Sequence, residues 1–206
     1  MAAGPSLDDR DPRGSKRGGG GGSKKVPRTA GRRSSDRGGD RPPWKVWLIR
    51  GVKLAMLAGF DSQTLPGNDD GFTGAIDLGF TVNFFGGSYS QVYVNNNGNI
   101  TFGGGVYTFT PNPFPVASQP MIAPWWGDVD TRGGALTDGA HDAVYWDVRR
   151  GQFTATWHNV GYYDTHDDMQ NDFQLILRTF EGCGVGDFDV EFRYNRCEWT
   201  AGDASD

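Results

Sequence analysis

The sequence feature that most constrains the fold is a short hairpin signal, VYVNNNGNITF, at Val92–Phe102. Apolar and polar residues alternate on both sides of Asn95–Gly98, as they do in strands that bury one face. The Asn-Gly pair favours positive φ values, because Asn tolerates left-handed geometry and Gly has no Cβ. The segment therefore predicts two antiparallel strands joined by a two-residue type I′ turn.

Period-two alternation recurs in other segments of the chain. Apolar residues occupy every second position of Ala75–Phe85, which predicts a strand with one buried face. Two more hairpins are predicted, one from Ala143–Val148 with Phe153–Val160 and one from Phe173–Phe180 with Phe188–Tyr194. About seven short strands without a crossover helix indicate an all-β fold. We expect an antiparallel β-sandwich-like domain with Gly-, Asn- and Asp-rich turns.

The alternation also assigns side chains to faces of the predicted sheets. Thr154, Thr156 and His158 are expected on a solvated face, opposite Trp157. In the last predicted strand, Glu191 is expected to point outward between inward-facing aromatic and aliphatic residues. A one-residue slip would exchange the two faces, so the register of this strand should be strongly fixed.

The two parts of the chain carry opposite charge. Residues 1–53 hold 14 Lys or Arg against 5 Asp or Glu, a net charge of +9. Residues 54–206 hold 6 Arg, no Lys and 20 Asp or Glu, a net charge of −14. An acidic domain without lysine repels nucleic acid and anionic membranes. We therefore expect no nucleic-acid partner for the second part.

The first 43 residues are predicted to be a disordered basic tail. They are rich in Gly, Arg, Ser and Pro, with five consecutive glycines at Gly18–Gly22, and show no apolar periodicity. Such a segment cannot bury enough apolar surface to offset its chain entropy. An RNA-binding role is the alternative, suggested by Arg37-Gly38-Gly39. The tail lacks aromatic residues for base stacking, which favours a solvated tail.

Residues 44–59 form a short apolar and basic segment with some helical character. The segment is too short to span a bilayer and is interrupted by Arg50 and Lys53. It makes no clean signal peptide, because its apolar core is broken and it lies far from residue 1. No transmembrane segment is predicted, and the β domain is expected over residues 60–206.

Four segments in a fixed order resemble the NIDO domain family, the extracellular domain type of nidogen and alpha-tectorin. They are Leu65–Gly86, Gln91–Phe102, Ile122–Arg132 and Asn171–Ser205. The resemblance covers about residues 60–206. It implies a non-catalytic module of cell–matrix adhesion, extracellular or at the cell surface, carried in a larger protein. Extracellular proteins or glycans are the implied partners, and the domain is expected to continue beyond Asp206.

Two groups of acidic residues are candidate metal ligands. Asp128 and Asp130 lie two positions apart, so on a strand they would share one face and be able to share a cation. Asp69 and Asp70 lie in a predicted turn. Calcium prefers six to eight oxygen ligands from flexible loops. The alternative, which we favour from sequence, is turn capping and backbone hydrogen bonding by these carboxylates. No other cofactor is expected.

The sequence predicts no enzyme. Asp128 and Asp130 could be spaced like a glycosidase pair, but no second feature distinguishes an acid from a base. No GxSxG elbow, HExxH motif or phosphate-binding loop is present. The alternative function is a carbohydrate-binding module of a secreted glycan-processing protein.

Adjacent aromatic residues could serve either function. Neighbours on a strand point to opposite faces, so one member of each pair is expected inward and one outward. An outward ring could stack on a sugar or a partner protein, whereas capping of the sandwich ends is the structural alternative. The candidates are Trp125, Trp126, Tyr162 and Tyr163.

Cys183 and Cys197 are the two cysteines of the chain. An even count fits one disulfide in an exported protein. The predicted hairpin opposes this pairing, because about nine extended residues span roughly 30 Å and a disulfide needs Cα atoms about 4.4–6.8 Å apart. Either the last strand ends early and the chain folds back, or the cysteines do not pair with each other.

Overall fold

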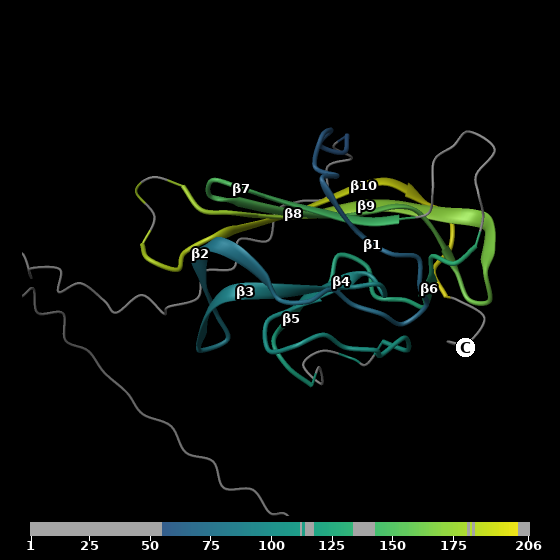
Figure 1. Cartoon of the computed structure of the whole chain (residues 1–206), viewed down its shortest axis with the longest axis horizontal. Helices are drawn as coiled ribbons and strands as arrows, with labels where there is room; N and C mark the ends of the chain where they lie inside the picture. Colours follow the sequence, from purple (N-terminus) through teal and green to yellow (C-terminus); the bar gives the residue numbers. More distant parts are fainter. Residues whose placement is uncertain are drawn as a thin grey trace, which may run out of the picture. The chain divides into compact units, whose positions relative to one another are not determined.

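The computed structural model shows an all-strand fold without helices over the residues it describes: 55–111, 113, 118–133, 143–180, 182 and 184–201 (Figure 1). This confirms the predicted all-β class. Within that part of the chain no helix could cross a membrane. The predicted tail, 1–43, lies outside the described residues, and so does the predicted helical segment up to residue 54. Residues 55–59 form no helix.

The described residues form ten strands. They are β1 Gln63–Leu65, β2 Ile76–Phe84, β3 Gly87–Asn95, β4 Asn99–Thr101, β5 Met121–Ile122, β6 Val129–Asp130, β7 Ala143–Arg149, β8 Gln152–Tyr162, β9 His166–Arg178 and β10 Asp189–Cys197.

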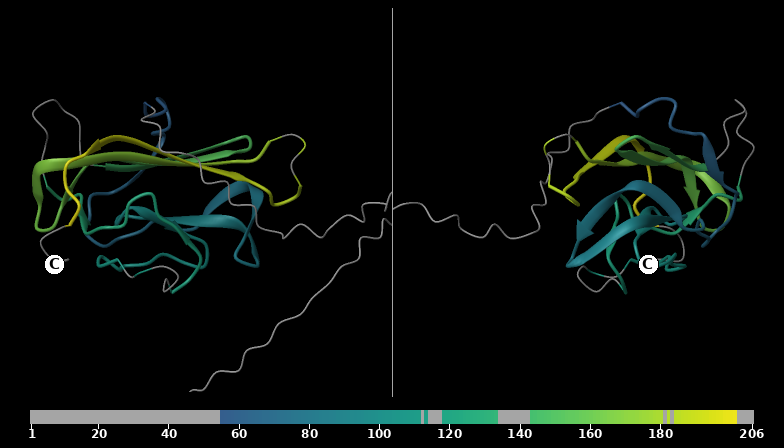
Figure 2. Two further views of the ribbon diagram at one scale, coloured as in Figure 1. Left: turned by 180° about the vertical axis from the view of Figure 1, so that it is seen from behind. Right: turned by 60° about the vertical axis from the view of Figure 1, so that its left-hand side comes forward.

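These strands build two antiparallel sheets. One sheet has the order β1-β7-β8-β9-β10, with β6 paired to one end of β8, and the other has the order β2-β3-β4-β5. Figures 1 and 2 show the sheets as two layers facing each other. The observed architecture is the predicted antiparallel sandwich. The predicted hairpins are also confirmed, since β7 pairs with β8 and β9 pairs with β10.

The core lies between the two layers. Leu78 and Val82 of β2 face it from one sheet, and Phe153, Trp157 and Phe173 face it from the other. The rings of Trp157 and Phe173, which are register partners on β8 and β9, stack with centroids 5.1 Å apart. Large aromatic surface is therefore buried where the alternation predicted an inward face.

The start of the described chain covers part of the outer face of the six-stranded sheet (Figure 1). Gln174 accepts a hydrogen bond from the Leu57 N–H at 2.9 Å and donates to the Leu57 carbonyl at 3.2 Å. Gln174 also donates to the Thr156 hydroxyl at 2.8 Å. Thr156 is consequently buried, and Thr154 is buried as well, so the prediction of a solvated face is wrong for both. His158 keeps 40% of its side chain exposed.

The turn between β3 and β4 differs from the predicted two-residue turn. Asn95 pairs with Asn99, so the loop has three residues. Gly98 has a φ of 83° and its N–H donates to the Asn95 carbonyl at 3.3 Å. A three-residue hairpin loop of this kind combines a turn with a left-handed residue. Asn97 does not adopt the positive φ of a type I′ turn, because its side chain is committed to neighbouring loops.

Gly98 is required both for its backbone conformation and for space. A Cβ at this position would overlap the carbonyl oxygen of Trp125. We expect Gly98→Ala to lower the free energy of unfolding by about 2–4 kcal/mol, since left-handed strain and overpacking add. Urea denaturation of the full chain measures this loss. Gly79→Ala is the matched control, because Gly79 has a φ of 71° with open space around it. Equal losses in the two variants would contradict a steric requirement at Gly98.

Glu191 lies on the outer face of β10 as predicted, but it is buried rather than solvated. Its carboxylate pairs with Arg178 and accepts a hydrogen bond from Arg193 Nε at 2.7 Å. Burial opposes ionisation of Glu191, yet the two guanidinium groups outweigh it and hold its pKa below the usual range. Glu191 therefore keeps its negative charge although it is buried, because Arg178 and Arg193 pair with it.

The lowered pKa of Glu191 gives a pH-dependent prediction. A lowered folded-state pKa contributes stability above the unfolded-state pKa, about 4.3, and this stability is lost as pH falls through the folded value. Glu191→Gln should cost about 1–3 kcal/mol of unfolding free energy at pH 7 and markedly less near pH 3. Urea midpoints at both pH values measure it.

Glu198→Gln is the control for Glu191. The Glu198 side chain is 48% exposed and lies 3.9 Å from Arg196, so its loss should cost under about 1 kcal/mol. A Glu191→Gln cost that is the same at both pH values would contradict the assigned role.

Candidate functional site

The β3–β4 turn is polar and fully buried. Asn95, Asn96 and Asn99 have no exposed surface, and Asn97 is 1% exposed. The indole N–H of Trp157 donates to the Asn95 and Asn96 carbonyls at 3.2 and 3.0 Å. Buried amides are stable only when their hydrogen bonds are made. The turn is therefore held in place by the opposite sheet rather than by solvent.

The amide side chains of the turn join two distant parts of the chain. Asn96 donates to the carbonyls of Asp69 and Val129. Asn97 donates to Asp70 Oδ1 at 2.8 Å and accepts from the Val129 N–H at 3.0 Å. These bonds bring the loop that carries Asp69 and Asp70 beside β6.

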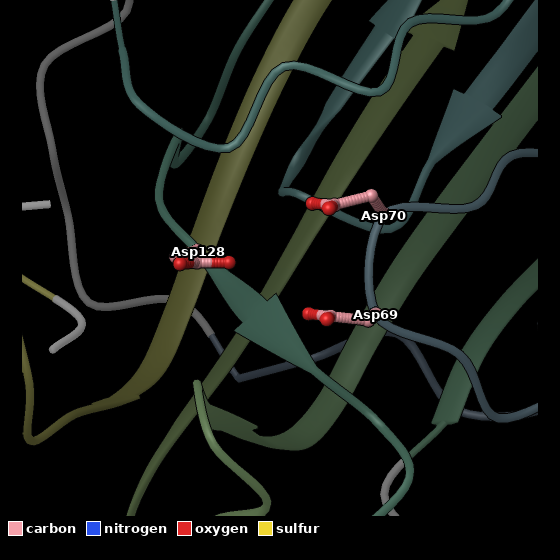
Figure 3. Close-up of side chains that lie close together, drawn as sticks. All are labelled: Asp69, Asp70 and Asp128. Atoms are coloured by element: carbon pink, nitrogen blue, oxygen red, sulfur yellow. The ribbon is translucent and has the colours of Figure 1, made fainter. Parts of the chain in front are cut away.

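Three carboxylates meet at this place: Asp69 and Asp70 from the loop after β1, and Asp128 from the residue before β6. Each offers an oxygen, and the three oxygens lie within 4.8 Å of one another. Figure 3 shows the Asp69 and Asp70 side chains pointing toward the side of Asp128. We call this group the carboxylate cluster. It is the candidate functional site.

The carboxylate cluster concentrates negative charge in a partly buried place, where Asp128 is buried and Asp69 and Asp70 are half-buried. Burial, followed by repulsion from Asp69, Asp70 and Asp130, raises the pKa of Asp128 to about 6. Burial, followed by repulsion from Asp130, Asp70 and Asp164, also raises the pKa of Asp69. One Asp69 oxygen, Oδ1, is buried without a hydrogen-bond partner. Chemically, such a cluster favours the uptake of a proton or a cation.

Asp130 is separated from the cluster by its own partners. Arg132 Nη2 lies 2.5 Å from Asp130 Oδ2, and the backbone N–H groups of Arg132 and Thr165 donate to the carboxylate at 2.9 Å each. Burial opposes ionisation, but these donors outweigh it and lower the pKa of Asp130. Of the two carboxylates that sequence spacing placed together, only Asp128 belongs to the cluster.

The candidate aromatic residues take different places. Trp125 is partly buried and packs against the core, with its ring 5.8 Å from that of Trp199. Trp126 is half-buried and donates its indole N–H to the Thr108 carbonyl at 3.0 Å. Tyr162 is buried, whereas Tyr163 is 38% exposed. Trp125 and Trp126 also line a shallow, largely apolar pocket with Pro111, Pro113, Ala123, Pro124 and Thr200.

Cys197 ends β10, is exposed and forms no disulfide within the described residues. Cys183 lies outside those residues. The pairing of the two cysteines therefore stays a prediction.

Comparison with known proteins identifies the family. The family model described as the nidogen-like domain matches residues 90–206, which is more than half of the chain. The chain belongs to the nidogen-like (NIDO) domain family. The matched range begins inside β3, so it includes Asp128 and the Asn turn, whereas Asp69 and Asp70 precede it.

Curated relatives agree with the nidogen-like assignment. Alpha-tectorin of Gallus gallus is 34% identical over 190 residues, covering 79% of this chain and 9% of the relative. Alpha-tectorin of Homo sapiens is 30% identical over 168 residues, covering 70% and 7%. Nidogen of Drosophila melanogaster is 30% identical over 145 residues, covering 60% and 10%. The chain thus spans a tenth or less of these relatives, and no solved structure matches it significantly.

Two residues that organise the carboxylate cluster were not predicted from the sequence. Asn97 was interpreted only as part of a turn, although it bonds both Asp70 and Val129. Arg132 was not assigned a role, although it divides Asp130 from the cluster and also reaches Asp69 at 3.2 Å. The available signal for Arg132 was its position two residues after Asp130, on the same face of an extended segment.

Asn97 gives a test of how the site is held together. We expect Asn97→Ala to lower the unfolding free energy by about 2–3 kcal/mol, because two buried hydrogen bonds are lost together. Asn83→Ala is the control, since Asn83 is exposed and makes one side-chain bond, to the Val185 carbonyl. Its expected cost is under about 1 kcal/mol. Chemical denaturation distinguishes the two, and similar losses would contradict a central role for the turn.

Proposed function

We propose that this nidogen-like domain is a non-catalytic extracellular adhesion module that binds another macromolecule of the cell–matrix environment. The observation that carries the proposal is the family match over residues 90–206 together with the similarity to alpha-tectorin and nidogen. A net charge of −14 over residues 54–206, with no lysine, supports an extracellular setting rather than a phosphate-rich partner.

The described site residues support binding rather than catalysis. Asp130 is fully buried and paired with Arg132, so it cannot act on a glycan together with Asp128. The surface offers aromatic side chains instead, one half-buried and one exposed. Trp126 borders the apolar pocket, and Tyr163 keeps 38% of its surface exposed. Tryptophan and tyrosine are enriched among the residues that dominate binding energy at protein interfaces.

Direct binding measurements test the proposal. The full chain is immobilised and exposed to a panel of purified extracellular-matrix glycoproteins, each before and after enzymatic deglycosylation. We expect saturable binding to at least one member, weakened about tenfold by Trp126→Ala. Phe85→Ala is the control, because Phe85 is an aromatic residue with 75% exposure on the β2–β3 turn.

The outcomes separate the functional classes. Binding that survives deglycosylation supports a protein partner, and binding that is lost supports a glycan partner. No binding across the panel, or turnover of a glycan by the purified chain, would overturn the adhesion proposal.

A further inference from the structure

The carboxylate cluster has the geometry of a calcium site. Oxygens that bind one Ca²⁺ at about 2.3–2.6 Å lie at most about 5 Å apart. One oxygen each of Asp69, Asp70 and Asp128 lies within 4.8 Å of the others. We propose that these three residues bind a calcium ion that ties the loop after β1 to β6.

A second observation points to a ligand independently of the acidic composition. Asp128 is only 2% exposed, yet among the described residues none donates a hydrogen bond to its carboxylate, and Arg132 attracts it only at longer range. One of its oxygens lies within 4.8 Å of an oxygen of Asp69 and of Asp70, whose side chains point toward it (Figure 3). Asp69 Oδ1 is likewise buried without a partner. An unpartnered buried carboxylate is costly, whereas a bound cation removes that cost.

Asp130 serves as an internal comparison two residues further along the chain. It is equally buried, but Arg132 and two backbone N–H groups satisfy its carboxylate. Arg132 also contacts Asp69 Oδ2 at 3.2 Å, whereas Asp69 Oδ1 is left without a donor. The Arg132 guanidinium thus neutralises Asp130, whereas no described arginine lies as close to Asp128.

The ligand set selects the kind of cation. The cluster offers carboxylate oxygens and neither imidazole nor thiolate, which disfavours zinc. The carboxylates come from an irregular loop and a strand start, and calcium accepts such flexible geometry, whereas magnesium requires a near-ideal octahedron. Water would complete the six to eight oxygens that calcium takes.

Calcium here would stabilise a loop that belongs to no strand. The loop Leu65–Gly71 is fastened to the β6 segment by Asn68, which accepts from the Thr131 N–H at 2.8 Å and donates to the Thr131 hydroxyl at 2.9 Å. A cation bridging Asp69 and Asp70 to Asp128 would add a second link between the same two segments.

Calcium titration of the full chain tests the site. If the Kd for calcium is about 10⁻⁴ M, a free calcium concentration roughly twentyfold above that Kd should raise the Tm by about 5 °C. EDTA should reverse the rise. Terbium, which replaces calcium, should show luminescence sensitised by nearby tryptophan that calcium competes away. Asp128→Asn should abolish both signals, and its Tm in EDTA should equal or exceed that of the wild type, because repulsion is relieved.

Two further variants keep the result decisive. Asp61→Asn removes an exposed carboxylate outside the cluster and should retain the full calcium response. If the Asp128→Asn variant does not fold, Asp70→Asn takes its place. Asp70 is partly exposed, so its substitution should be better tolerated. The proposal is overturned if the wild type shows no calcium-dependent rise in Tm up to about 10 mM, a generous excess over a typical extracellular Kd. It is equally overturned if the cluster variants respond as Asp61→Asn does.

Discussion

The hydrogen bonds from the Trp157 indole to the buried Asn turn are the interaction on which this fold depends. A chain of polar residues lies between the two sheets, where unsatisfied backbone carbonyls would be costly. Trp157 donates to the Asn95 and Asn96 carbonyls from the opposite sheet, and its ring stacks on Phe173. The two layers are therefore joined by a directional bond as well as by apolar packing. This bond fixes how the turn, and everything attached to it, is oriented.

Much of the fold could be predicted because most strands bury one face and therefore alternate. Ile76–Phe84 of β2 and Asp189–Cys197 of β10 follow the predicted pattern closely. The prediction failed on the outer face of β8, where the segment around Leu57 lies over Thr156. That covering depends on hydrogen bonds between Gln174 and Leu57, which are 117 positions apart. No local pattern reports a contact over such a separation.

The type of the β3–β4 turn and the carboxylate cluster were only partly predictable, because both depend on side-chain contacts between segments that are distant in the sequence. Asn tolerates left-handed geometry, and this property alone suggested a type I′ turn. In the folded chain the side chain of Asn97 instead bonds Asp70 and Val129, which changes the loop length. Spacing likewise placed Asp128 and Asp130 together. Their separation follows from Arg132, whose pairing with Asp130 a count of acidic residues cannot reveal.

The turn also links the carboxylate cluster to the apolar pocket that Trp125 and Trp126 line. The Trp125 N–H donates to the Gly98 carbonyl and the Gly127 N–H donates to the Asn97 carbonyl, both at 3.3 Å. These two bonds hold the segment Trp125–Asp128. Within it, Trp125 packs against the core, Trp126 borders the pocket and Asp128 belongs to the carboxylate cluster. Because these positions share one short backbone, a cation at Asp128 would restrain Trp126 as well. Calcium would then affect binding of the proposed partner by ordering the surface around Trp126, without contacting the partner itself.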